Sequence, residues 1–162
     1  MRHLKDRESK QIIKDFTTRF PASTKSLDLV RHLEEEMVED NLVLFADDKP
    51  WIVRIQGRLF PSLKYDQVLV TLPKIIVDMG AVPHIANGAQ IMRPGIRQIE
   101  GHFNRDDVII IEDERHRKMI ALGIAETDSE QMRTMTKGRV IANIHYVGDP
   151  LWQAFANKPE TD

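Results

Sequence analysis

Cysteine is absent from this sequence of 162 residues. The chain can therefore form no disulfide, no zinc site with thiolate ligands and no thiol redox centre. Its six histidines show none of the short ligand spacings of zinc helices and zinc fingers. We expect neither a metal site nor a cofactor, and we expect His145, which lies in an apolar stretch, to be a hydrogen-bonded core residue.

Long apolar runs are also missing. The longest run, Leu42 to Ala46, has five residues, whereas a membrane helix needs about 20. The first residues, Met1 to Glu8, are rich in charge and lead into no apolar signal core, so export is not expected. These features predict a cytoplasmic protein with one ordinary domain or two small ones.

Neither sign of charge dominates the chain. The sequence has 23 basic and 25 acidic residues, which gives a formal net charge of −2. A strongly basic chain would indicate nucleic-acid binding directly, because neutralisation of phosphates supplies most of the non-specific affinity. Here any nucleic-acid partner has to be bound by a local patch.

Catalytic motifs are missing as well. The sequence contains no nucleophile elbow, phosphate-binding P-loop or dinucleotide fingerprint. The adjacent carboxylates Asp47-Asp48 and Asp106-Asp107 fall at expected turns, where aspartate bonds to the backbone. Neighbouring residues of a strand face opposite sides, so neither pair has acid–base geometry. We predict that the protein is not an enzyme and has no catalytic residue.

The first half of the sequence combines helical and strand patterns. Ser9 is a candidate N-cap of a helix that stops at Pro21, and apolar spacing predicts a second helix from Leu27 to Met37. Dense β-branched and aromatic residues predict a hairpin of strands 42–45 and 51–55 around a turn at 47–50. A further short strand is expected at 68–70. This mixture predicts an α/β module.

The second half has closely spaced short strands with small helical insertions, which favours a compact barrel over βαβ units. Asp128 or Ser129 is expected to cap a helix that stops at Gly138. The charged segment from Glu112 to Arg117 is interpreted as a solubilising hairpin tip. The expected strands are residues 75–77, 108–111, 118–125 and 139–146, with a short helix at 80–86.

Two glycines and a proline mark the most distinctive run, residues 88–96. Pro94 fixes φ, and Gly95 permits a close backbone approach that a side chain would prevent. The run predicts a rigid bend that either turns a barrel corner or presents amide groups to a phosphate or a base edge. Arg93 and Arg97 flank the bend and favour the second interpretation.

Together with later segments, this run resembles the PUA domain. More narrowly, the chain resembles stand-alone archaeal PUA proteins and the malignant T-cell-amplified sequence family of translation factors. Phe60-Pro61-Ser62-Leu63 resembles the F-Y/F-P-T-L element of the pre-PUA domain, with serine in place of threonine. The PUA motifs are Val77-Asp78-x-Gly80-Ala81, Gly88-Ala89-x-Ile91-Met92-x-Pro94-Gly95-Ile96, Lys137-Gly138 and Asn143-Ile144-His145-Tyr146-x-x-Asp149-x-Leu151-Trp152.

The resemblance implies an α+β fold with a pre-PUA domain over residues 1–73, a PUA pseudo-barrel with two short helices over 74–156 and a flexible tail over 157–162. It also implies binding of structured RNA, either tRNA or rRNA, and association with the small ribosomal subunit in initiation or recycling. The implied RNA-binding residues are Gly88, Ala89, Gln90, Arg93, Pro94, Gly95 and Arg97, with Lys74, Lys137 and Arg139 as weaker neighbours.

A second hypothesis belongs to another functional class. Eukaryotic members of the resembled family work with a density-regulated-protein partner, and the mildly acidic C-terminal half suits protein contact as readily as RNA contact. The alternative function is therefore a protein-interaction adaptor in a translation or RNA-modification complex.

Overall fold

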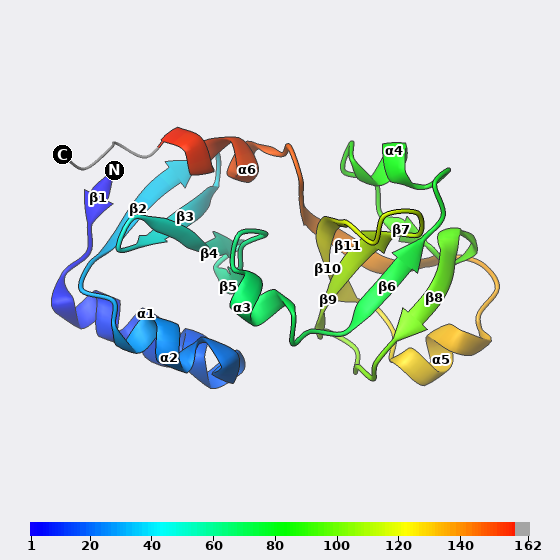
Figure 1. Ribbon diagram of the computed structural model, residues 1–162, viewed down its shortest axis with the longest axis horizontal. Helices are drawn as coiled ribbons and strands as arrows, with labels where there is room; N and C mark the ends of the chain where they lie inside the picture. The colour runs from blue at the N-terminus through cyan, green and yellow to red at the C-terminus, as the bar shows by residue number, and fades with distance from the viewer. Residues whose placement is uncertain (158–162) are drawn as a thin grey trace. The chain divides into compact units, whose positions relative to one another are not determined.

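The computed structural model describes residues 1–157, which form two compact units (Figure 1). The first unit contains Met1–Thr71 and the described residues from Pro150 onward, and the second contains Leu72–Asp149. The expected boundaries, 1–73 and 74–156, therefore need correction at the C-terminal end. Helix α6, Pro150–Ala154, joins the first unit because it contacts β2 and β3 there and buries Leu151 and Ala154.

The expected flexible tail, 157–162, falls almost entirely outside the described residues. Only Asn157 is described, and it belongs to the 3-10 helix η3, Phe155–Asn157.

A five-stranded antiparallel sheet in the order β1-β2-β3-β4-β5 forms the centre of the first unit. The predicted hairpin is confirmed as β3 and β4, and Asp47 and Asp48 form its turn with φ of 45° and 76°. Positive φ at both residues suits a two-residue hairpin turn, so Lys49 and Pro50 begin the strand. The strands are β1 Arg2–His3, β2 Leu33–Val38, β3 Asn41–Ala46, β4 Lys49–Ile55 and β5 Arg58–Pro61.

Short helices complete the first unit. Helix α1 begins at Asp6, ahead of the predicted cap Ser9, and the Glu8 side chain accepts a hydrogen bond from the Lys5 backbone amide (3.3 Å). Its buried residues are Ile12 and Phe16, which follow the apolar spacing of the sequence. The helices are α1 Asp6–Arg19, η1 Pro21–Ser23, α2 Thr24–Asp28 and α3 Asp66–Leu69.

Two predictions for the first unit are wrong. The helix expected from Leu27 to Met37 is instead α2 followed by strand β2, which lies between β1 and β3 and so has hydrogen-bonded neighbours on both edges. The residues expected to form a strand at 68–70 belong mainly to helix α3, where Val68 and Leu69 are buried. In both places tertiary packing overrides the local pattern.

The second unit is a curled mixed sheet in the order β7-β11-β10-β9-β6-β8 (Figure 1). Strands β6 and β9 run parallel and the other neighbours are antiparallel. Its core includes the fully buried Ile75, Ile109 and Ile141. The predicted α+β fold with a barrel-like second half is confirmed. The strands are β6 Lys74–Val77, β7 Ile91–Met92, β8 Ile96–Glu100, β9 Val108–Asp113, β10 Met119–Ala125 and β11 Arg139–Tyr146.

Three short helical segments interrupt these strands: α4 Val82–Ile85, the 3-10 helix η2 Arg93–Gly95 and α5 Ser129–Thr134. The predicted cap of α5 is confirmed, since the Asp128 carboxylate accepts a hydrogen bond from the Gln131 amide (2.8 Å). The helix ends before Gly138, whose φ of 93° instead turns the chain into β11.

Strands β10 and β11 approach closely at Gly123. A methyl group at this position would lie 2.4 Å from Cγ2 of Ile141 and 3.0 Å from the carbonyl oxygen of Ala142. The register of the two strands shifts between Leu122 and Gly123, as at a β-bulge. Space, not turn geometry, requires a glycine here.

Candidate nucleic-acid interface

The glycine–proline run forms one wall of a cleft in the second unit. The cleft has a volume of about 450 Å³ and lies beside α4, β7 and η2. Ala89, Gln90, Pro94 and Gly95, four of the predicted site residues, line it. The remaining lining residues are Val77, Asp78, Ala81, His84, Ile85, Ile91 and Met92. The predicted run is therefore a wall of a concave surface.

Backbone proximity explains the glycine in the bend. A methyl group on Gly95 would lie 3.2 Å from Cβ of Ala81, and the Gly95 carbonyl oxygen accepts a hydrogen bond from the Asp78 amide (2.9 Å). At the other end of the run, Gly88 has a φ of 90° and packs against the Tyr146 ring. Larger residues at either glycine would move the walls of the cleft.

Asn143 joins the two parts of the sequence signature. Its side-chain amide on β11 donates to the carbonyl oxygens of Ile85 (3.1 Å) and Ala89 (3.0 Å), and its backbone amide donates to Oε1 of Gln90 (2.8 Å). These bonds hold the segment between α4 and β7 against β11. Gln90 and Asn143 therefore position the cleft wall, although they lie 53 residues apart.

The buried His145 has the core role predicted for it. Its Nδ1 lies 2.8 Å from Oδ2 of Asp149, and the same oxygen accepts a hydrogen bond from the Tyr146 backbone amide (2.9 Å). Three of the four positions of the Asn-Ile-His-Tyr segment, Asn143, His145 and Tyr146, thus have structural roles.

Arg93 also takes part in internal contacts. Its guanidinium donates to the carbonyl oxygens of Met132 (Nε, 2.7 Å) and Ile96 (3.3 Å), and its backbone amide donates to the carbonyl of Gly138 (2.8 Å). Because Pro94 has no amide proton, the bend offers fewer backbone donors than an anion-binding nest. Through these hydrogen bonds, Arg93 holds the bend against α5 and the start of β11.

The other predicted cations are distributed around the second unit, and most of them pair with acids. Arg97, with 61% of its side chain exposed, lies 3.8 Å from Asp78 and 3.6 Å from Glu114. Arg139 forms an ion pair with Glu126 at 2.5 Å. Lys137 is exposed, and no ion pair to it occurs within residues 1–157.

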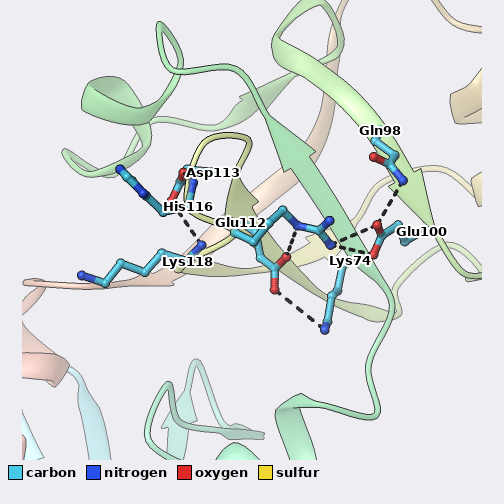
Figure 2. Close-up of polar contacts among 8 residues, drawn as sticks. Lys74, Gln98, Glu100, Glu112, Asp113, His116 and Lys118 are labelled. Carbon is cyan, nitrogen blue, oxygen red and sulfur yellow. Dashed lines mark hydrogen bonds and ion pairs between the residues drawn. The ribbon is translucent and has the colours of Figure 1, made fainter.

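Lys74 belongs to a separate network, which Figure 2 shows. Its Nζ lies 3.8 Å from Glu112, and Glu112 is only 5% exposed and pairs with Arg117 at 2.9 Å. Arg117 also bonds Glu100 at 2.9 Å. Lys74 therefore neutralises a buried carboxylate.

The same network corrects the interpretation of the charged segment. Strand β9 extends to Asp113, so Glu112 and Asp113 are buried strand residues and only Glu114 to Arg117 form the exposed tip. The Asp113 carboxylate accepts hydrogen bonds from the backbone amides of His116 (2.6 Å) and Lys118 (3.2 Å). These bonds hold the pKa of the Asp113 carboxyl below its usual range.

Comparison with known proteins places this architecture in a family. The PUA domain model matches residues 73–147, which fall within the second unit. An uncharacterised protein of Methanocaldococcus jannaschii is 31% identical over 92% of this chain and 93% of its own length. The chain belongs to the PUA-domain family.

Other relatives extend the likeness to proteins of the translation machinery. Translation machinery-associated protein 20 of Schizosaccharomyces pombe is 30% identical over 71% of this chain and 67% of its own. The family resemblance seen in the sequence is confirmed, since malignant T-cell-amplified sequence 1 of Rattus norvegicus is 28% identical over 75% of this chain and 65% of its own. A hypothetical protein of Pyrococcus horikoshii, 25% identical, superposes with a TM-score of 0.78 over 94% of this chain and 98% of its own.

The prediction of site residues left out the seven other residues that line the cleft. Val77, Asp78, Ala81, Ile91 and Met92 belong to the PUA motifs of the sequence, whereas His84 and Ile85 belong to none of them. Within the described part of the chain, no helix is long and apolar enough to cross a bilayer. No group of three or more His, Cys, Asp or Glu residues there could hold a metal ion.

Proposed function

We propose that this protein is a non-catalytic, cytoplasmic RNA-binding protein of the translation apparatus, which binds tRNA or rRNA through the cleft of its PUA domain. The observation that carries the proposal is the cleft itself, because four of the predicted RNA-binding residues line it and Asn143 fixes its wall. Association with the small ribosomal subunit, in initiation or recycling, is supported by the relatives whose names include the translation machinery.

Two kinds of group contribute to the proposed binding, the uncharged walls of the cleft and the exposed cations of the same unit. The walls at Ala89, Met92 and Pro94 are small or apolar, and such surfaces suit the face of a base or the edge of a ribose. Exposed cations of the same unit, Arg97 and Lys137, supply contacts to phosphates and hence the salt dependence. Arg93 acts as a positioning residue and Lys74 as a partner of Glu112, so neither is needed as a phosphate ligand.

Replacement of two exposed lining residues tests the proposal. The double variant Ala89→Glu and Pro94→Glu places two carboxylates in the cleft, where they repel phosphate. We expect at least a tenfold loss of affinity for total tRNA or small-subunit rRNA, measured by filter binding at fixed salt. The control is Ala22→Glu, which places a carboxylate at an exposed alanine of the first unit. Unchanged affinity of the double variant would remove the cleft from the proposal.

One observation supports the alternative function of a protein-interaction adaptor. Arg97 and Arg139 form ion pairs with carboxylates of their own unit. Such a surface has little net field and suits a protein partner such as a second translation factor. Co-purification before and after ribonuclease treatment distinguishes the two functions, because an adaptor keeps its partner after the RNA is digested. Binding of purified RNA that the cleft variant abolishes supports the RNA-binding function.

A further inference from the structure

A second pocket lies in the first unit. Its volume is about 470 Å³, and it is lined by Lys49, Pro50, Trp51, Lys64, Trp152, Phe155 and Ala156. Pro150 to Asn157 return to the first unit and so place Trp152 and Phe155 opposite residues from the start of β4. The two tryptophans of the sequence, 101 positions apart, both line this pocket.

One wall of the pocket is a rigid aromatic stack. The Trp51 indole lies parallel to the Tyr65 ring, with 4.5 Å between ring centres and 5° between planes. Tyr65 is fully buried and stacks in turn on Phe16 at 5.9 Å. The stack ties Trp51 to the core of the unit, so its half-exposed ring is held in one orientation.

Each indole has a lysine ammonium close to it. Nζ of Lys49 lies 4.8 Å from the centre of the Trp51 ring, and Nζ of Lys64 lies 4.2 Å from that of Trp152. Both lysines are exposed at the ends of flexible side chains. Among the described residues that line the pocket two are lysines and none is a carboxylate, in a protein whose net charge is −2.

We propose that this pocket binds an unpaired nucleotide of a single-stranded RNA segment, with the base against an indole and the adjoining phosphates on Lys49 and Lys64. A nucleotide has the two features that the pocket can bind. Its base offers a flat π face for an aromatic side chain, and its phosphate offers a nearby negative charge for a lysine. An acidic peptide offers the charge but has no flat π group to contact the aromatic residues of the pocket. On this proposal the first unit contacts RNA independently of the PUA cleft.

Intrinsic fluorescence tests the pocket directly, because both tryptophans line it and the PUA cleft contains none. The probe is single-stranded oligoadenylate of about ten nucleotides, within the usual site size of single-strand binders. We expect saturable quenching of the full-length protein, and we expect Trp152→Ala to weaken binding of the labelled oligonucleotide by about fivefold or more. Trp152→Phe keeps an aromatic face and should retain most of the affinity.

The lysines give a second readout that does not depend on packing. The double variant Lys49→Gln and Lys64→Gln should reduce the slope of log affinity against log salt by about 1.4, or about 0.7 for each phosphate that is no longer neutralised. Lys25→Gln, an exposed lysine of α2 in the same unit, is the matched control. Equal oligoadenylate affinity and equal salt slope in wild type and the pocket variants would overturn the proposal, as would quenching by oligoglutamate but not by oligoadenylate.

The test also separates this pocket from the proposed PUA cleft. Ala89→Glu with Pro94→Glu should leave the quenching by oligoadenylate unchanged, since those residues belong to the other unit. Loss of the quenching in that variant would show that the oligonucleotide binds at the cleft, and the pocket proposal would then fail while the proposed function stands.

Discussion

Replacing Asn143 by alanine should loosen the wall of the PUA cleft. Asn143 makes two side-chain hydrogen bonds, to the carbonyls of Ile85 and Ala89, and Asn143→Ala removes both of them. Its backbone bond to Gln90 remains available, because it does not need the side chain. The substitution therefore removes one specific connection between β11 and the α4–β7 segment.

The size of the effect follows from these hydrogen bonds. Two bonds at about 1 kcal/mol each give a loss of about 2 kcal/mol. The side-chain oxygen of Asn143 is buried without a hydrogen-bond partner in the described protein, so its removal returns part of that loss. We expect a net destabilisation of about 1 to 2 kcal/mol. Asn143→Asp should cost more, because a carboxylate would face the two carbonyl oxygens.

Hydrogen exchange measures this change in the second unit alone. The amides of the buried strand residues Ile109 to Ile111 report on opening of that unit, whereas tryptophan fluorescence reports only on the first unit. Asn87→Ala is the matched control, since Asn87 is exposed and its side chain makes one bond to the Pro83 carbonyl (3.0 Å). If Asn143→Ala and Asn143→Asp both change the stability by no more than this control does, the positioning role of Asn143 is refuted.

Three further predictions concern the same unit. Gly123→Ala should destabilise it by about 1 to 3 kcal/mol in hydrogen exchange, because the added methyl group meets Ile141 in a packed core. Arg93→Ala should lower the stability of the unit by about 2 kcal/mol and leave the salt dependence of RNA binding unchanged. Arg97→Ala should lower the slope of log affinity against log salt and leave the stability unchanged. The reverse pattern would refute a positioning role for Arg93 and a phosphate-binding role for Arg97. The pKa of the Asp113 carboxyl is lower in the folded protein than in the unfolded chain, where it is about 3.9. The ionised carboxylate therefore stabilises the fold at pH values above about 3.9, and this stabilisation is lost as the pH falls through the pKa of the folded state. Acid unfolding followed by circular dichroism should therefore be less steep in Asp113→Asn, and an unchanged profile would contradict the assignment.

The strands of the second unit could be predicted because their local and tertiary preferences agree. Val108 to Ile111 is a run of β-branched residues and forms the buried centre of β9, and the pattern from Arg139 to Tyr146 matches β11 at both ends. The segment from Leu27 to Met37 could not be predicted from pattern alone. Its glutamates lie on β2 because that strand pairs with β3 in a hairpin and with β1, which lies more than 30 residues earlier in the chain.

In the candidate site, too, some features follow from the local sequence and others depend on residues that are distant in the sequence. The bend at Pro94 and Gly95 follows from residue chemistry, and the structure places it on the surface of the domain. The role of Arg93 does not follow, because its bonding partners Met132 and Gly138 lie about 40 residues away in sequence. A guanidinium beside a bend looks the same in sequence whether it meets a phosphate or a backbone carbonyl.

Under the proposed function, the internal contacts of the cations limit how the PUA cleft recognises RNA. With Arg93 bonded to carbonyls, Lys74 paired with Glu112 and Arg139 paired with Glu126, two of the five predicted cations, Arg97 and Lys137, are left for phosphates. A surface of this kind gains little from non-specific attraction, so its affinity depends more on the fit between the RNA and the cleft wall. Asn143 and the glycines fix that wall through backbone contacts. Under the proposed function, the placement of these uncharged groups, more than the number of arginines, decides which RNA is bound.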